Sequence, residues 1–289
     1  MDVLKKYLAH NDMVRVTVVD ATDLVQQARD IHLLSNVATA ALGRTLIASL
    51  MIASNFKEND NKLTVQIKGD GPLKSIIVCS DNTLNIKGYV SVPDVLLPLN
   101  KIGKLDVAKA VGKGTLTVIK DIGLKEPYIG TCELVSSEIA EDFAYYFVTS
   151  EQTPCAIALG VNIGTDNKVT KAAGYMVEPL PNCSDEIIDT LEVVNNSISS
   201  VTNLMIDLGD ILDVAKTVAV DNEVKEIYSK EPKYKCDCNE ERIKRAIISL
   251  GKKDAIEALR NNNNVLELSC SFCNKCYRYN EKEVLDMFD

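Results

Sequence analysis

KLTVQIKGDGPLKSIIVCSDNTLNIKGYV, residues 62–90, is the stretch that decides the fold class of this 289-residue chain. It contains three short segments rich in β-branched residues, Lys62–Lys68, Ser75–Ser80 and Thr83–Val90. The turn-forming sequences GDGP and DN separate them, which is the pattern of an antiparallel meander. The sequence therefore predicts consecutive antiparallel strands rather than strict alternation of strands and helices.

Strand and helix patterns both surround this stretch. Val14, Val16 and Val18 alternate with polar residues as in a strand, whereas Asp23–Ser54 has the periodicity of a helix. A further helix is predicted at Glu138–Val148. Four more strands are predicted at Thr115–Asp121, Tyr128–Leu134, Cys155–Val161 and Val169–Val177. Strands in blocks beside helices predict an α+β fold, and we expect this antiparallel-sheet domain to cover residues 1–178.

A segment of different character follows at residues 179–230. Two prolines restrict its start, and Ser184 followed by two acids predicts the beginning of a helix. Aliphatic residues then recur at helical spacing in two stripes, Ile187, Leu191, Val194 and Ile198, followed by Val201, Leu204, Met205 and Leu208. Such stripes predict amphipathic helices, so we expect a helical linker, with a third short helix at Ile211–Val220.

The composition predicts a folded protein without a membrane segment. The chain is 46% hydrophobic, which is enough for a sizeable core. No run approaches the roughly 18 consecutive apolar residues of a membrane helix, and the opening MDVLKKYLAHNDM lacks the apolar centre of a signal peptide. We therefore expect a cytoplasmic protein that binds no membrane.

Cysteines concentrate near the C-terminus, where five of the nine lie in the last 54 residues. In a reducing compartment their spacing indicates metal or redox chemistry rather than a permanent disulfide framework. Cys236 and Cys238 form C-x-C, and after 31 intervening residues Cys270 and Cys273 form C-x-x-C. Two close pairs of thiolates suit tetrahedral zinc, so we predict that these four cysteines bind one Zn²⁺ per chain.

Residues 231–289 are too few to be stable on a hydrophobic core alone. Their 59 residues fall below the roughly 70 to 80 at which a core suffices. A structural zinc ion contributes about 10–16 kcal/mol in small peptide modules. We expect a small C-terminal zinc-binding domain that unfolds when the metal leaves.

Residues 231–289 could form either a permanent zinc ribbon that stabilises the C-terminal region or a redox switch. The C-x-C pair favours the switch. A disulfide between residues two apart closes a small ring, which strains the bond and keeps it easily reduced. Each pair can also close on itself, and oxidation of both pairs would remove all four ligands.

Several motifs together resemble the thirty-three-kilodalton chaperonin family, the bacterial redox-regulated heat-shock holdases. The likeness covers essentially the whole chain, and the motifs occur in the family's order. Besides the cysteine spacing they are HLLSNVATAALGRTL (32–46), GTLTVIKDIGLKEPYIG (114–130), FAYYFVTSEQTPCAIALGV (143–161) and AAGYMVEPLP (172–181).

The resemblance implies an ATP-independent chaperone whose reduced, zinc-bound form is inactive. It implies that oxidation forms the disulfides Cys236–Cys238 and Cys270–Cys273, that zinc leaves, and that the activated form binds unfolding proteins, commonly as a homodimer. The two aliphatic stripes would then become client-binding surface. Residues 179–229 carry ten acids and two lysines, and this charge would keep the complex in solution.

Cys276 departs from the family pattern, because it extends the second pair to C-x-x-C-x-x-C. It is either a bystander, a substitute ligand, or a thiol that resolves the second disulfide differently. The two histidines, His10 and His32, are expected to be packed or surface side chains rather than catalytic ones.

A structural zinc-ribbon module that binds nucleic acid or protein is the main alternative. Nucleic acid would require a basic surface, but residues 231–289 carry 11 basic and 11 acidic residues and the whole chain has a net charge of -9. A thiol oxidoreductase would need its C-x-x-C motif within a βαβ pattern, which residues 231–289 lack. GKGT at 112–115 lacks the spacing of a phosphate loop, so we expect no nucleotide, no nucleic-acid partner and no enzymatic activity.

Overall fold

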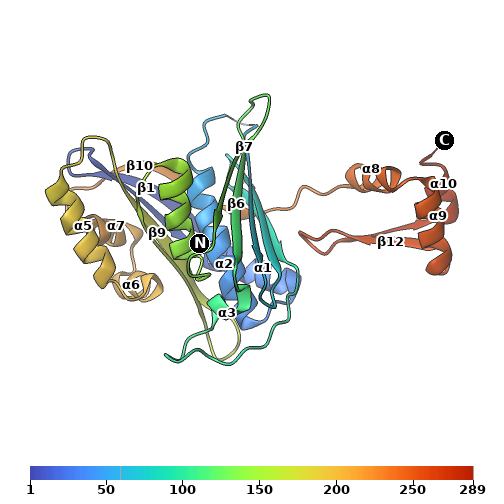
Figure 1. Cartoon of the computed structure of the whole chain (residues 1–289), viewed down its shortest axis with the longest axis horizontal. Helices are drawn as coiled ribbons and strands as arrows, with labels where there is room; N and C mark the ends of the chain where they lie inside the picture. The colour runs from blue at the N-terminus through green and yellow to red at the C-terminus, as the bar shows by residue number, and fades with distance from the viewer. Residues whose placement is uncertain (59, 289) are drawn as a thin grey trace. The chain divides into compact units, whose positions relative to one another are not determined.

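A long apolar helix lies between two β-sheets in the computed structural model of the chain (Figure 1). The structure describes residues 1–58 and 60–288. Nearly all residues of this helix, α2 (Asn36–Ala53), are buried, and it packs on strands of both sheets. Because it is apolar on every side, it forms the centre of a core. Gly43 permits close packing, since a Cβ there would lie 2.8 Å from methyl groups of Val25 and Val161.

By length and hydropathy, α2 is also the one helix among the described residues that could cross a membrane. However, 89% of it is buried inside the protein. The core helix of a folded domain has the same properties, so the composition of α2 is explained by its place between the two sheets.

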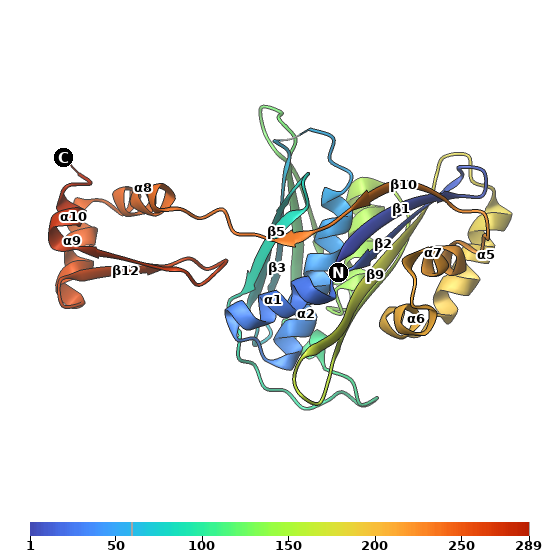
Figure 2. The same cartoon turned by 180° about the vertical axis from the view of Figure 1, so that it is seen from behind.

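The first sheet has five strands, all antiparallel, and pairs β1, near the start of the chain, with β10 (Figure 2). In spatial order they are β10 (Lys225–Lys230), β1 (Val3–Ala9), β2 (Val14–Asp20), β9 (Val169–Pro179) and β8 (Ala156–Ile163). The sequence analysis missed β1 and β10. Both are rich in lysine and tyrosine, and their pairing with each other joins distant parts of the chain, which local pattern does not show.

The second sheet has six strands and includes the predicted meander, which is confirmed. In spatial order they are β11 (Lys233–Tyr234), β5 (Asn85–Val90), β4 (Ser75–Asp81), β3 (Lys62–Gly69), β6 (Gly114–Asp121) and β7 (Tyr128–Glu133). The short pair between β11 and β5 is parallel, and the other pairs are antiparallel. These two sheets and their helices confirm the predicted α+β class.

Two predicted helices are corrected by the structure. The single helix expected at Asp23–Ser54 is two, α1 (Thr22–His32) and α2, because Leu33 is left-handed at φ 50° and Ser35 starts α2 by accepting a bond from the Ala38 N–H. The helix expected at Glu138–Val148 is α4 (Ala140–Tyr146), continued by the π-helical turn η1 (Phe147–Glu151). A short helix, α3 (Val107–Val111), was not predicted.

One predicted strand is also shorter than expected. The segment Thr83–Val90 becomes a strand only at Asn85, because the Asp81 carboxylate accepts bonds from the Thr83 N–H, the Thr83 hydroxyl and the Asn85 N–H. These bonds hold residues 81–85 in a turn.

Three helices cover the outer face of the five-stranded sheet, and together we name them the helical layer: α5 (Asp185–Ser197), α6 (Val201–Leu208) and α7 (Ile211–Ala219). The helix α6 packs on β8 and β9, α7 packs on β2 and β1, and α5 packs on α7. Ser184 stands at the start of α5, but among the described residues its side chain makes no capping bond. Asp210 does cap α7, by accepting a bond from Leu212.

The chain divides into two compact units, Met1–Tyr234 and Lys235–Asp289. The segment predicted as a linker, residues 179–230, therefore packs within the first unit, because α6 and α7 pack on the sheet, α5 packs on α7, and β10 pairs with β1. That residues 179–230 act as a separate functional part stays a prediction.

The second unit, which we call the tail, is built from helices and one hairpin. Its elements are α8 (Glu240–Leu250), α9 (Lys252–Asn261), β12 (Val265–Ser269), β13 (Cys276–Asn280) and α10 (Glu281–Leu285). Its small buried core comprises Ile247, Ala255, Leu259, Leu266, Tyr277, Tyr279 and Val284. A core of this size contributes little stability alone.

Candidate metal centre

The turn of the β12–β13 hairpin positions Cys270 and Cys273. The Cys270 carbonyl accepts bonds from the Cys273 N–H at 3.3 Å and the Asn274 N–H at 2.8 Å, and the Cys270 N–H donates to the Lys275 carbonyl at 3.0 Å. Asn274 is left-handed at φ 56°. These bonds fold the C-x-x-C segment so that both side chains leave the same side of the turn.

Cys236 and Cys238 lie in the irregular segment that precedes α8. Asn239 caps this helix by accepting a bond from the Arg242 N–H at 2.9 Å, and Arg242 pairs with Asp237 between the two cysteines. Cys238 also packs against the small core of the tail. The ion pair with α8 and the packing of Cys238 on the core thereby fix the position of the C-x-C segment.

The four thiols come together in one cluster. The Sγ atoms of Cys236 and Cys270 are 3.7 Å apart, those of Cys238 and Cys273 are 3.4 Å apart, and all four lie within 4.8 Å of one another. A tetrahedral ion with zinc–sulfur bonds of ~2.3 Å places its sulfurs about 3.8 Å apart. The number, type and spacing of these donors therefore fit Zn²⁺.

The protons of the cluster are shared unequally. Burial raises the pKa of Cys238, but hydrogen bonds from the Tyr277 hydroxyl and from the other thiols outweigh burial and lower that pKa to about 7. Burial raises the pKa values of Cys236 and Cys273. Of these three thiols Cys238 most readily loses its proton, and a cation must displace the protons of Cys236 and Cys273 to gain them as ligands.

Tyr277 is a functional residue that the sequence analysis missed. Its hydroxyl lies 3.3 Å from the Cys238 Sγ, and the bond to Cys238 raises its own pKa. The available signal was its buried place in the alternating run of β13, directly after Cys276. A donor to a thiolate orients the ligand and lowers the cost of its charge.

Cys276 is exposed and stands apart from the four clustered thiols. It pairs with Ser269 in the hairpin, on the strand face that also carries Glu267 and Arg278. The neighbouring Tyr277 points the other way, into the core. This orientation favours the bystander interpretation over a substitute ligand.

Comparison with known proteins agrees with this geometry. A sequence model of the family described as Hsp33 protein matches residues 2–280. The chain belongs to the Hsp33 family. A 33 kDa chaperonin from Acetivibrio thermocellus is 41% identical over 98% of this chain and 96% of the relative, and one from Caldanaerobacter subterraneus subsp. tengcongensis is 44% identical over 96% and 94%. The predicted resemblance is thereby confirmed.

A solved structure supports the same assignment. The crystal structure of the 33 kDa chaperonin, or heat shock protein 33 homolog, from Thermotoga maritima superposes with a TM-score of 0.91 at 35% identity. The superposition covers 99% of this chain and 97% of the Thermotoga maritima chain. This Hsp33-family chain therefore shares its fold with a chaperone over both units.

In this Hsp33-family chain most of the eight predicted client-binding residues are buried or partly buried, with α6 packed on the sheet and α5 packed on α7. Leu191, Val201 and Met205 are buried, and Leu208 is exposed. The remaining four are partly buried: Ile187, Val194, Ile198 and Leu204. The apolar stripes of the helical layer are therefore largely covered.

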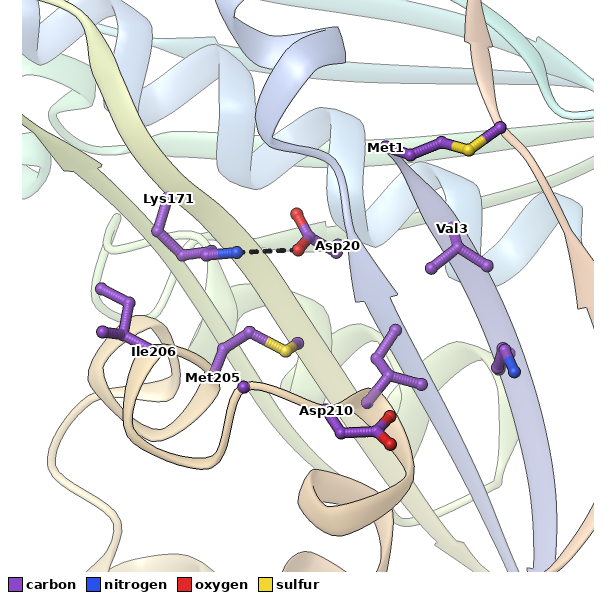
Figure 3. Close-up of a pocket in the computed structure, with 10 residues that line it drawn as sticks. Met1, Val3, Asp20, Lys171, Met205, Ile206 and Asp210 are labelled. Carbon is purple, nitrogen blue, oxygen red and sulfur yellow. Dashed lines mark hydrogen bonds and ion pairs between the residues drawn. The ribbon is translucent and has the colours of Figure 1, made fainter.

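The helical layer meets the sheet imperfectly at one end. A pocket of about 490 Å³ opens there between α6 and β1, with Met205, Ile206 and Val3 among its walls (Figure 3). Lys171 and Asp20 form an ion pair of 2.9 Å on the strands beside it. Charged side chains, among them Lys5 and Asp210, line this pocket beside the apolar ones.

Proposed function

We propose that this Hsp33-type chaperone is a redox-regulated, ATP-independent holdase that binds unfolding proteins and prevents their aggregation under oxidative or heat stress. The observation that carries the proposal is the cluster of four thiols, within 4.8 Å of one another, in a tail whose own core is small. Zinc, when bound by Cys236, Cys238, Cys270 and Cys273, would hold the fold of the tail together.

The switch step is the oxidation of two thiolate pairs. For each pair, two electrons pass to an oxidant such as peroxide, which takes up two protons and leaves as two waters, while a sulfur–sulfur bond forms. We assign these bonds to Cys236 with Cys238 and to Cys270 with Cys273. A disulfide sulfur is no longer a thiolate ligand, so bound zinc would lose its four ligands and the tail would lose its main source of stability.

The client surface is proposed to be the apolar side of the helical layer. In the folded protein α6 packs on the sheet and α5 packs on α7, and apolar residues of the sheet belong to the same core, among them Val14, Val16 and Tyr175. Separation of the layer would expose both surfaces at once. An exposed apolar surface of this kind binds unfolded chains without needing nucleotide.

The remaining expectations belong to the same proposal. Residues 1–178, 179–230 and 231–289 would act as core, client-binding linker and switch. The protein would work in the cytoplasm, form a homodimer on activation, and act without catalysis, nucleic acid or a membrane.

One titration tests the proposal. The reduced, zinc-loaded protein is treated with hypochlorite, or with peroxide at elevated temperature, while zinc release and aggregation of a thermally unfolding client are followed together. We expect zinc release and client protection to rise in step, and a thiol reductant to abolish the protection. Zinc that stays bound, or leaves without any gain in protection, would show that the four cysteines are only a structural staple.

A further inference from the structure

The chain is fastened to the six-stranded sheet immediately before the cysteine tail. In β11, which we call the anchor strand, Lys233 and Tyr234 pair with Asn85 and Ile86 of β5. The Tyr234 side chain is 9% exposed and belongs to the main hydrophobic core. A two-residue strand is too short to hold by ladder bonds alone, so the tyrosine side chain must supply most of the attachment.

The Tyr234 hydroxyl is enclosed by three hydrogen-bonding groups. It donates to the Gly88 carbonyl at 2.7 Å, and the Gly88 N–H donates back to it at 3.3 Å. The His32 Nε2 lies 2.9 Å away, and the two rings meet edge to face. Since the only hydroxyl proton is directed to Gly88, His32 must be the donor in its contact. Removing a buried hydroxyl from its hydrogen-bond partners costs free energy, so these bonds resist detachment of Tyr234.

The anchor strand ends a segment that spans both sheets. Within residues 225–234, β10 pairs with β1 of the five-stranded sheet and β11 pairs with β5 of the six-stranded sheet. Between them, Lys230 Nζ donates to the Asn82 carbonyl at 2.9 Å. This segment is the covalent path from the tail to the helical layer, because α7 precedes it and the tail begins directly after it at Lys235.

We propose that Tyr234 is the anchor at which unfolding of the tail stops. Cys236, the first thiol of the cluster, lies two residues beyond it in sequence, and the boundary between the two units falls directly after Tyr234. The inference rests on the proposed function for its consequence: loss of zinc opens the tail, but the helical layer is freed only when the anchor strand and β10 also detach.

The physical basis is that proteins open in cooperative units, and a segment held by buried contacts opens only at a higher free energy than a loosely packed one. Tail opening breaks the small tail core and leaves the bonds of the Tyr234 hydroxyl to Gly88 and His32 intact, since both partners belong to the first unit. The strength of this anchor would therefore set how much additional stress, such as heat, is needed after oxidation before clients are bound.

The test uses full-length protein and hydrogen exchange measured by mass spectrometry. Tyr234→Phe keeps the ring in the core and removes the hydroxyl, and His32→Leu removes the donor on the other side. Tyr145→Phe is the matched control, because Tyr145 is 42% exposed on α4. Each protein is compared zinc-loaded and after peroxide has removed the zinc, over a range of temperatures.

In the parent protein, zinc loss should speed exchange in residues 235–289 while residues 225–234 stay protected. Both Tyr234→Phe and His32→Leu should speed exchange of residues 225–234 by about fivefold or more, as expected for one lost hydrogen bond, and the layer should open at a lower temperature. Tyr145→Phe should match the parent.

Two results would overturn the anchor. One is loss of protection in residues 225–234 together with the tail in the parent protein, and the other is equal exchange in Tyr234→Phe and Tyr145→Phe. Failure of the proposed function would give other results, whatever the behaviour of Tyr234. Either hydrogen exchange in the tail would stay slow after zinc loss, or opening of the helical layer would not reduce the aggregation of a client protein.

Discussion

The Tyr277 hydroxyl donates a hydrogen bond of 3.3 Å to the Sγ of Cys238, which joins the core of the tail to its thiol cluster. Tyr277→Phe should therefore weaken zinc binding by about 10- to 100-fold, as loss of a partner to a metal ligand generally does. A competition titration with a chromophoric chelator measures this. Tyr279→Phe is the matched control, because Tyr279 is equally buried on β13 and its hydroxyl has no partner among the described residues. Equal affinities in the two variants would contradict the role given to Tyr277.

Detachment of the helical layer should activate the chaperone without oxidation. Val218 on α7 is fully buried against the sheet, so Val218→Asp would place a charge in an apolar contact at a cost of several kcal/mol. We expect the reduced variant to suppress client aggregation while keeping its zinc. Val193→Asp on α5, at a position that is 71% exposed, should leave the reduced protein inactive. A zinc-loaded Val218→Asp protein with no activity would argue against the layer as the cover of the client surface.

A single carboxylate organises the turn before α4. Asp142 is fully buried and accepts bonds of 2.8–3.1 Å from the N–H groups of Val135, Ser136, Ser137 and Ile139. Ile139 is held at φ 76°, which is unfavourable for a β-branched residue. Asp142→Ala should lower the free energy of unfolding by about 3 kcal/mol or more, measured by urea denaturation.

The control for that measurement is Asp106→Ala. Asp106 also accepts a backbone bond, from Lys109, but at the exposed start of α3. Loss of such a cap costs about 1 kcal/mol. If both variants lost the same stability, burial of the Asp142 network would not be the cause.

Lys6 makes the stability of the first unit depend on pH. Its amine donates to the Ser54 carbonyl at 2.9 Å and to Asn55 Oδ1 at 2.5 Å, and burial lowers its pKa from 10.5 to about 8. Between these values the unfolded chain binds more protons than the folded one, so this group makes stability rise as pH increases from about 8 to about 10.5. The rise is at most about 3.5 kcal/mol, because one pKa unit corresponds to about 1.4 kcal/mol.

Urea unfolding of the parent and of Lys6→Met at several pH values between 7 and 10.5, with zinc and a reductant present, measures that dependence. As the pH rises, the free energy of unfolding of the parent should increase relative to that of Lys6→Met. Parallel curves would mean that Lys6 titrates normally in the folded protein.

Local patterns were sufficient for the strands of the meander and for the apolar stripes, because β-branched runs and three-and-four spacing reflect burial of one face directly. They could not reveal the break between α1 and α2, where Leu33 adopts a left-handed conformation within an otherwise helical pattern. They also could not reveal β10 or β11, whose partners β1 and β5 lie far away in the sequence.

The cysteine spacing predicted which thiols would cluster, since two close pairs in a short tail leave few other arrangements. Spacing cannot show what surrounds the sulfurs. The bond from Tyr277 and the outward direction of Cys276 both depend on the register of the β12–β13 hairpin, in which Ser269 faces Cys276 and Leu268 faces Tyr277. A shift of one residue in this register would exchange the two side chains.

The place of β1 in its sheet also determines when the protein can finish folding. This strand lies between β2 and β10, and the bond from Lys5 to Glu226 joins residues 221 positions apart. A ribosome must therefore make nearly the entire chain before one edge of the N-terminal strand finds its partner. Pairing over such a separation is slow, and the waiting edge is open to other strands. A protein proposed to shield the unfinished folds of others thus spends its own synthesis with an unpaired strand of its own.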